Sequence, residues 1–377
     1  MSCRRWIVTP DLDRIEVPGA AEAEERAARV VAAAFAESPP RHRPRRAARP
    51  IAAVAVAVAL IAAVLSPPGR AFVDHVRRAV GVDHARPALF TLPAPGRILV
   101  TTGGATWVTY ADGSRRLLGA YDDASWSPFG RYIAATRPNE LVTLDPEGTV
   151  RWTLARPGVR FPRWTGSATN TRIAFLSGNR LHVVAGDGKG DFVAGDAPPA
   201  GIPPAWSSSL GFILAYADTD GRVHALITAK GGSLWSATPP GAPQSVEWSS
   251  DGRQLLVLSP GRISIFDGAH GHLVAGEAAR DVTAVAYRPG TTMYAELHRS
   301  AAGSRITLGP RTLFSLAGEL RGLTWSPDGR WLLVGSPASD QWVFIRADGS
   351  RIVAVSNISA QFHSQAFPEV EGWCCGP

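Results

Sequence analysis

The chain has 377 residues, 45% of them hydrophobic and 19% charged, which excludes a disordered protein and leaves enough apolar material for a large core. Its formal charge is +7, but the densest basic run lies beside an apolar segment and not on a stretch where basic and aromatic residues alternate. A nucleic-acid-binding protein is therefore not expected.

Residues 1–49 are expected to form a cytoplasmic segment with one amphipathic helix. Residues 19–37 are rich in alanine, glutamate and arginine, and helical spacing places Val30, Ala34 and Phe35 on one side. Such a helix either docks a cytoplasmic partner or remains solvated without one, and the sequence leaves both interpretations open.

Residues 50–68 contain an uninterrupted apolar run, from Ile51 to Leu65, and are predicted to be a transmembrane helix. As a helix, these 15 residues would span roughly 22 Å, short of the ~30 Å hydrocarbon core, although the flanking prolines extend the tolerated length. Two alternatives are weaker. A cleaved signal peptide has a short basic start, whereas nearly fifty residues precede this run, and a buried helix would show an amphipathic pattern.

The arginines around this segment set the expected orientation. Five arginines crowd its N-terminal side over residues 41–49, whereas Asp74 dilutes those on the other side. Because the positively charged flank of a membrane helix stays in the cytoplasm, the N-terminus is placed there and the rest of the chain outside. Residues 69–95 then supply a juxtamembrane helix and a stiff proline-rich spacer.

A strand–turn–strand unit recurs along residues 96–377. Its clearest copy is LTWSPDGRWLLVGSP at residues 323–337, where Pro327 and Gly329 suit a tight turn between two strands. Each copy keeps an aromatic residue before the turn, and the first six of these recur at intervals of 38 to 42 residues. A period near forty residues is typical of propeller blades with four short strands each. The aromatic positions are Trp126, Trp164, Trp206, Trp248, Tyr287, Trp325 and, at the end of the chain, Trp373.

The two ends of the repeat region complement each other. Residues 97–102, 106–111 and 114–119 match the second, third and fourth strands of a blade, and residues 370–375 match a lone first strand. The simplest closure pairs them, because that removes exposed strand edges. The predicted fold is therefore all-β, a seven-bladed β-propeller whose C-terminal strand closes the first blade, preceded by N-terminal helices including one transmembrane helix.

The WSPDGR sequence, followed by an apolar strand and an Asp-Gly turn such as Asp348-Gly349, resembles the blade of TolB-type, WD-repeat-like β-propellers. The resemblance extends from about Gly96 to the C-terminus and is specific for the fold rather than for function. It implies a propeller on the outer side of the membrane, in a bacterial envelope, in agreement with the distribution of arginines.

No catalytic motif stands out in the sequence. It contains no HExxH motif, no Walker loop, no G-x-S-x-G elbow and no paired carboxylates at a useful spacing. The expectation is a protein that is not an enzyme and uses no cofactor or metal, although propeller loops can build active sites without local motifs. Cys374 and Cys375 are expected on opposite sides of the closing strand, with a vicinal disulfide as the alternative.

One face of the ring is expected to bind a partner. It is formed by the loops before each aromatic position and by those between second and third strands, whereas the SPDG turns lie on the other face. The longest of these loops, residues 356–367, is either functional or a plain connector to the closing strand. The candidate contact residues are Asp122, Asp123, Arg137, Arg156, Arg160, Asp340, Phe362, His363 and Gln365.

The favoured hypothesis is a membrane-anchored, extracytoplasmic propeller that binds another protein or an envelope ligand without catalysis. The alternative is a transmembrane regulator, similar to membrane-tethered anti-sigma proteins, whose cytoplasmic helix docks a partner while the propeller senses. Specific capture of a cytoplasmic protein by residues 1–49 would favour the regulator. A propeller enzyme is the least favoured hypothesis.

Overall fold

The computed structural model describes residues 91–207, 212–229 and 232–375. The amphipathic helix, the apolar run and the juxtamembrane helix predicted above lie outside the described residues. Within the described ranges, no helix is both long and apolar enough to cross a membrane.

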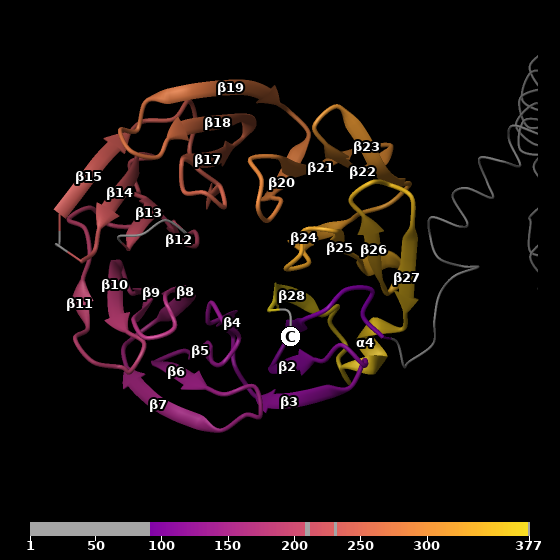
Figure 1. Ribbon diagram of the computed structural model, residues 1–377, viewed down its shortest axis with the longest axis horizontal. Helices are drawn as coiled ribbons and strands as arrows, with labels where there is room; N and C mark the ends of the chain where they lie inside the picture. The colour runs from indigo at the N-terminus through magenta and orange to yellow at the C-terminus, as the bar shows by residue number, and fades with distance from the viewer. Residues whose placement is uncertain (1–90, 208–211, 230–231, 376–377) are drawn as a thin grey trace, which may run out of the picture. The chain divides into compact units, whose positions relative to one another are not determined.

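Seven four-stranded antiparallel sheets surround a central axis, one for each predicted blade (Figure 1). Strands are named here from the axis outward. Blade 1 consists of β28 (Glu369–Cys374), β1 (Arg97–Thr102), β2 (Ala105–Thr109) and β3 (Arg115–Gly119). Blade 2 consists of β4 (Asp123–Trp126), β5 (Ile133–Arg137), β6 (Glu140–Leu144) and β7 (Val150–Ala155). Blade 3 consists of β8 (Val159–Gly166), β9 (Thr171–Ser177), β10 (Arg180–Ala185) and β11 (Phe192–Val193).

The remaining blades follow in chain order. Blade 4 consists of β12 (Ala205–Trp206), β13 (Ile213–Ala217), β14 (Val223–Ile227) and β15 (Gly232–Ala237). Blade 5 consists of β16 (Ser245–Trp248), β17 (Gln254–Ser259), β18 (Gly261–Asp267) and β19 (Leu273–Ala279). Blade 6 consists of β20 (Val282–Tyr287), β21 (Tyr294–Ser300), β22 (Gly303–Leu308) and β23 (Arg311–Leu316). Blade 7 consists of β24 (Arg321–Trp325), β25 (Trp331–Ser336), β26 (Gln341–Arg346) and β27 (Ile352–Ser356), with the short helices η2 (Pro337–Ser339) and α4 (Ile358–Gln361) in its connections.

The ring closes through the last strand. β28 runs antiparallel to β1, with Trp373 opposite Ile98 and Cys374 opposite Arg97. Figure 1 shows β28 beside the other strands of the first blade. The predicted seven-bladed propeller, closed by its C-terminal strand, is therefore confirmed.

The predicted turn between the first two strands of a blade is held by its own side chains. In blade 7, Ser326 Oγ donates to Asp328 Oδ1 at 2.6 Å, and the same oxygen accepts the backbone N–H of Arg330 at 3.0 Å. Gly329 has a φ of 64°, a left-handed conformation that favours glycine. The motif recurs because this turn needs a carboxylate and a glycine at fixed positions.

Buried apolar strands and tryptophan side chains hold neighbouring blades together. All six residues of β25 are buried. Trp206 Nε1 donates to the backbone oxygen of Arg163 at 2.8 Å, and Trp325 Nε1 donates to that of Ala286 at 3.0 Å. Each of these bonds joins an inner strand to the inner strand of the preceding blade and contributes about 1 kcal/mol. Trp248 Nε1 donates in the same way to the backbone oxygen of Ala205 at 3.1 Å, so the aromatic positions of blades 4, 5 and 7 share this interblade bond.

The proline-rich spacer predicted up to residue 95 ends earlier than expected. Leu92 and Ala94 are buried in the apolar cluster between blades 7 and 1, and the N–H of Leu92 donates to the backbone oxygen of Ala111 at 2.9 Å. Because these apolar side chains cover the junction where the ring closes, residues 92–95 belong to the body of the propeller.

Candidate functional site

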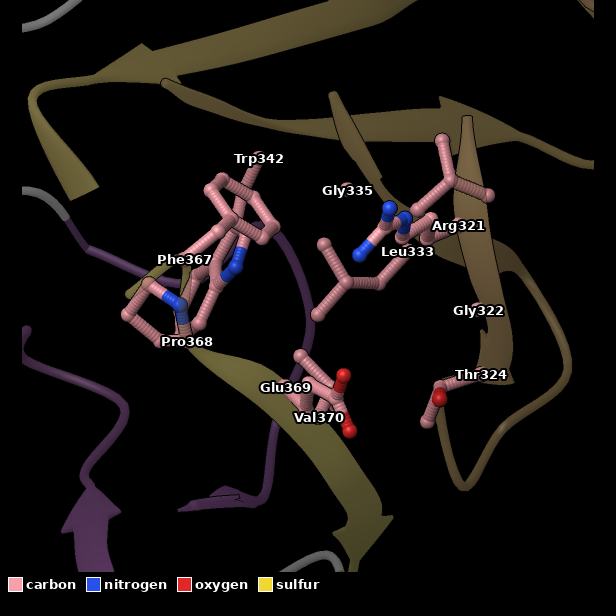
Figure 2. Close-up of a pocket in the computed structure, with 11 residues that line it drawn as sticks. Arg321, Gly322, Thr324, Leu333, Gly335, Trp342, Phe367, Pro368, Glu369 and Val370 are labelled. Carbon is pink, nitrogen blue, oxygen red and sulfur yellow. The ribbon is translucent and has the colours of Figure 1, made fainter. Parts of the chain in front are cut away.

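A cavity of about 200 Å³ lies between blades 7 and 1, on the face formed by the loops; we call it the loop-face cavity (Figure 2). Residues of β24 and β25 form one wall, and the residues that lead into β28 form the other. Its apolar lining includes Leu333, Trp342, Phe367 and Val370. This volume is smaller than that of typical sites for drug-sized ligands and fits a single side chain.

Charged side chains flank this apolar lining. Arg321 begins β24 and Glu369 begins β28, and Figure 2 shows Arg321 beside Leu333, across the cavity from Phe367. Arg321 Nε lies 2.6 Å from Glu319 Oε1, and this hydrogen bond lowers the pKa of Glu319 and raises that of Arg321. A side chain that entered the cavity would meet apolar surface inside and charge at the rim.

The shape of the cavity depends on a glycine. A Cβ at Gly335 would lie 2.6 Å from Phe367 Cε1, so only glycine lets this ring pack directly against β25. Phe367 in turn ends the longest predicted loop, residues 356–367, and places that loop beside the cavity.

Two predicted contact residues are structural: Phe362 inside this loop, and Asp340 in the connection between β25 and β26. Phe362 is 1% exposed and packs against Trp342 with ring centroids 5.3 Å apart, so its prediction as a surface contact is wrong. The loop sequence does not reveal that its aromatic residue turns into the core. Asp340 accepts hydrogen bonds from the N–H of Ser359 at 2.9 Å and from its hydroxyl at 2.7 Å, and thereby holds α4 in place.

The other predicted contact residues are divided between two regions. His363 and Gln365 are exposed in the loop beside the cavity. Four more residues belong to blades 2 and 3 and lie away from it: Asp122 and Arg160 are exposed, Arg137 is ion-paired within its own hairpin, and Arg156 is ion-paired with Asp191. The structure therefore does not gather the predicted contact residues into one site.

Ionisable side chains also meet on the inner strands near the axis. Glu371 accepts the hydroxyl of Thr101 at 2.5 Å, while Asp123 accepts the backbone N–H of Phe161 at 2.8 Å and lies 3.7 Å from Arg163. Burial raises the pKa of Glu371 to about 7, and the negative charge of Asp123 adds to this effect. Burial also raises the pKa of Asp123, against the attraction of Arg163. The carboxyl group of Glu371 can therefore exchange a proton near neutral pH.

Sequence reasoning missed Glu371, Arg163, Arg321 and Glu369. Arg321 and Glu369 stand four residues before the aromatic position of their own blade, Glu371 stands two before it and Arg163 one, so the four do not share a single register within the repeat. Only the closed ring brings them together, and no signal in a single copy could have identified them.

Cys374 and Cys375 are joined by a disulfide, as in the alternative considered from the sequence. The expectation that they point to opposite sides of the strand is wrong, because Cys375 follows the strand with a φ of 60° and its side chain turns back. In the described parts of the chain, no group of three or more His, Cys, Asp and Glu side chains is arranged to hold a metal ion.

No protein-family model and no curated protein matches this sequence. Among solved structures, the chain is similar to a chain of the mitotic checkpoint complex, with 18% identity and a TM-score of 0.54 over 70% of this chain and 92% of that one. It is also similar to the C-terminal WD40 domain of Sif2, with 12% identity and a TM-score of 0.53 over 72% and 88% of the two chains. Hsv2 of Kluyvelomyces marxianus shows 12% identity and a TM-score of 0.50 over 68% and 92%. At such identities the likeness shows the fold alone, a β-propeller of the WD40-like class.

Proposed function

We propose that this protein is a non-catalytic scaffold whose propeller binds another protein through its loop face. In this proposal the run from Ile51 to Leu65 anchors the chain in a bacterial membrane, with the N-terminus in the cytoplasm and a TolB-type propeller outside. The support for this topology is the apolar run itself and the five arginines that precede it.

The loop-face cavity is the observation that supports protein binding. Phe367 contributes aromatic surface to its lining, Arg321 stands at its edge, and Trp342 is fully buried behind it. Aromatic residues and arginine are enriched at protein interfaces, where an anchor side chain of one partner fills a pocket of the other. The exposed His363 and Gln365 beside the cavity supply the polar rim that such interfaces have.

A photo-crosslinking amino acid placed at Gln365 of the full-length protein tests this proposal in cells of its host. The matched control is Val274 on β19, an outer strand, whose side chain is 59% exposed. We expect one discrete protein adduct from position 365 and none from position 274. Adducts of equal yield at both positions, or at neither, would count against binding at the loop face.

Protease added to intact cells tests the proposed topology separately. If the propeller lies outside the cytoplasm, its exposed loops should be cleaved before lysis while residues 1–49 stay intact. A propeller that is cleaved only after lysis would contradict this arrangement and leave the binding proposal standing.

A further inference from the structure

Three turns of the propeller keep a serine, a glycine and an arginine in the spacing S-x-x-G-R, and one of the three lacks the aspartate. The turn of blade 2, residues 127–130, has Phe129 where the turns of blades 5 and 7 have Asp251 and Asp328. The side chain of Phe129 is 51% exposed. The substitution therefore gives up the carboxylate that holds this turn elsewhere and places a phenyl ring in solvent. Loss of a stabilising turn residue in exchange for an exposed aromatic ring is expected at a functional surface.

The same substitution leaves a cation unpaired. Arg253 Nε lies 3.9 Å from Asp251 Oδ2, and Arg330 Nε lies 3.8 Å from Asp328 Oδ2, each arginine two residues after its aspartate. Arg131 occupies the equivalent position in blade 2 and is exposed, with no ion-pair or hydrogen-bond partner among the described residues. Blade 2 thus presents a free positive charge beside an exposed aromatic ring.

A cavity of about 500 Å³ adjoins this turn between blades 2 and 3; we call it the turn-face cavity. Phe129, Arg131 and Tyr132 line it from blade 2, together with Trp152. The ring of Tyr132 stacks on that of Trp164, with centroids 6.2 Å apart and an interplanar angle of 15°. The cavity is therefore rich in aromatic surface.

Two buried polar groups that line this cavity lack hydrogen-bond partners. Trp164 is 9% exposed and Thr143 is 1% exposed, and neither Trp164 Nε1 nor Thr143 Oγ1 has a partner in the described part of the chain. The indole N–H of Trp206, at the equivalent position of the next blade, is hydrogen-bonded. The indole N–H groups of Trp126 and Trp373, at the same repeat position in blades 2 and 1, also lack partners among the described residues.

The charged side chains around the cavity determine which charge a ligand bound there should carry. Arg151 is paired with Asp145 at 2.8 Å, and Asp187 is paired with Lys189 at 3.4 Å. The unpaired charge at the turn-face cavity is therefore that of Arg131, which is positive, and it favours a negatively charged group.

We propose that the turn-face cavity binds a segment of a partner protein in which an aspartate or glutamate neighbours a large apolar or proline residue. The carboxylate pairs with Arg131, and the apolar or proline residue packs on Phe129, Tyr132 and Trp152. This cavity lies at the turn end of the inner strands, opposite the loop face. It is a second contact surface, independent of the loop-face cavity.

Selection of random twelve-residue peptides displayed on phage, against the immobilised full-length protein, tests the proposal. Enriched peptides should combine an acidic residue with a neighbouring aromatic or proline residue. The best of them, made synthetically, should bind Phe129→Asp and Arg131→Ala at least about tenfold more weakly than wild type. Arg253→Ala in blade 5 is the matched control and should bind like wild type.

Phe129→Asp separates binding from folding, because it restores the turn sequence of blades 5 and 7. Its unfolding temperature should equal or exceed that of wild type. If the unfolding temperature of Phe129→Asp is lower than that of wild type, its weaker binding could come from misfolding, and the proposal is then judged by the affinity of Arg131→Ala alone. Absence of any enriched peptide, enrichment of peptides without a carboxylate, or unchanged affinity in Arg131→Ala would overturn the proposal. Loss of cross-linking from position 365 would count against binding at the loop face and would not affect this proposal for the turn-face cavity.

Discussion

Replacing Glu371 with glutamine removes a carboxyl group whose pKa is raised from 4.5 to about 7 by burial. A raised pKa means that the folded protein holds this proton more tightly than the unfolded chain does. The carboxyl group therefore contributes stability that is fully present below pH 4.5 and is lost as the pH rises through about 7.

The size of this effect follows from the two pKa values. The rise from 4.5 to about 7 corresponds to about 3 kcal/mol of unfolding free energy. Because Glu371 also lines an open hollow at the axis, solvent screening reduces the expected value to about 2 kcal/mol. Neutral glutamine keeps an oxygen that accepts the hydroxyl of Thr101. Glu371→Gln should therefore unfold like wild type at about pH 4 and be about 2 kcal/mol more stable at about pH 8.

Urea unfolding followed by tryptophan fluorescence at these two pH values measures the difference. Glu369→Gln, an exposed position on the same strand, controls for the loss of one negative charge. An equal change in free energy at both pH values would refute the reasoning, as would a Glu371→Gln variant less stable than wild type at the higher pH.

Three further changes test other parts of the structure. Asp328→Ala removes the acceptor of two hydrogen bonds in the turn of blade 7 and should lower the free energy of unfolding by about 1 kcal/mol in urea titrations; no change would show that the carboxylate does not hold the turn. Gly335→Ala places a Cβ 2.6 Å from Phe367 Cε1 and should displace this ring, so cross-linking from Gln365 should fall while the circular dichroism spectrum stays the same. Deleting β28 exposes the edge of β1 and should yield aggregates in size-exclusion chromatography, whereas a soluble folded species would contradict closure by this strand.

The ring was predictable from the sequence because each blade repeats the same strand–turn–strand unit with an aromatic residue before the turn. The turn with a carboxylate and a glycine at Asp328 and Gly329 recurs in blade 5 at Asp251 and Gly252, and the aromatic residue before the turn recurs in every copy. The closing partner was predictable because residues 370–375 have the pattern of a first strand and the beginning of the repeat region lacks one. Pairing of Ile98 with Trp373 then follows from the need to leave no open edge.

The loop-face cavity could not be predicted in the same way. It forms where Arg321 and Leu333 of blade 7 meet Phe367, which precedes the closing strand, and this meeting exists only in the closed ring. Phe362 was mistaken for a surface residue because a loop sequence gives no periodic pattern from which burial could be read. The change at Phe129, by contrast, is visible in the sequence, as WSPFGR beside WSPDGR, but its meaning depends on the cavity next to it.

The central claim is that the loop-face cavity receives a side chain of a partner protein. Thr324→Phe fills this cavity from β24, and Thr312→Phe on β23 places the same side chain at an exposed position outside it. The decisive measurement is the affinity of each variant for the partner that cross-links to position 365. We predict at least about tenfold weaker binding for Thr324→Phe and wild-type binding for Thr312→Phe. Equal affinity of wild type and Thr324→Phe would contradict the claim.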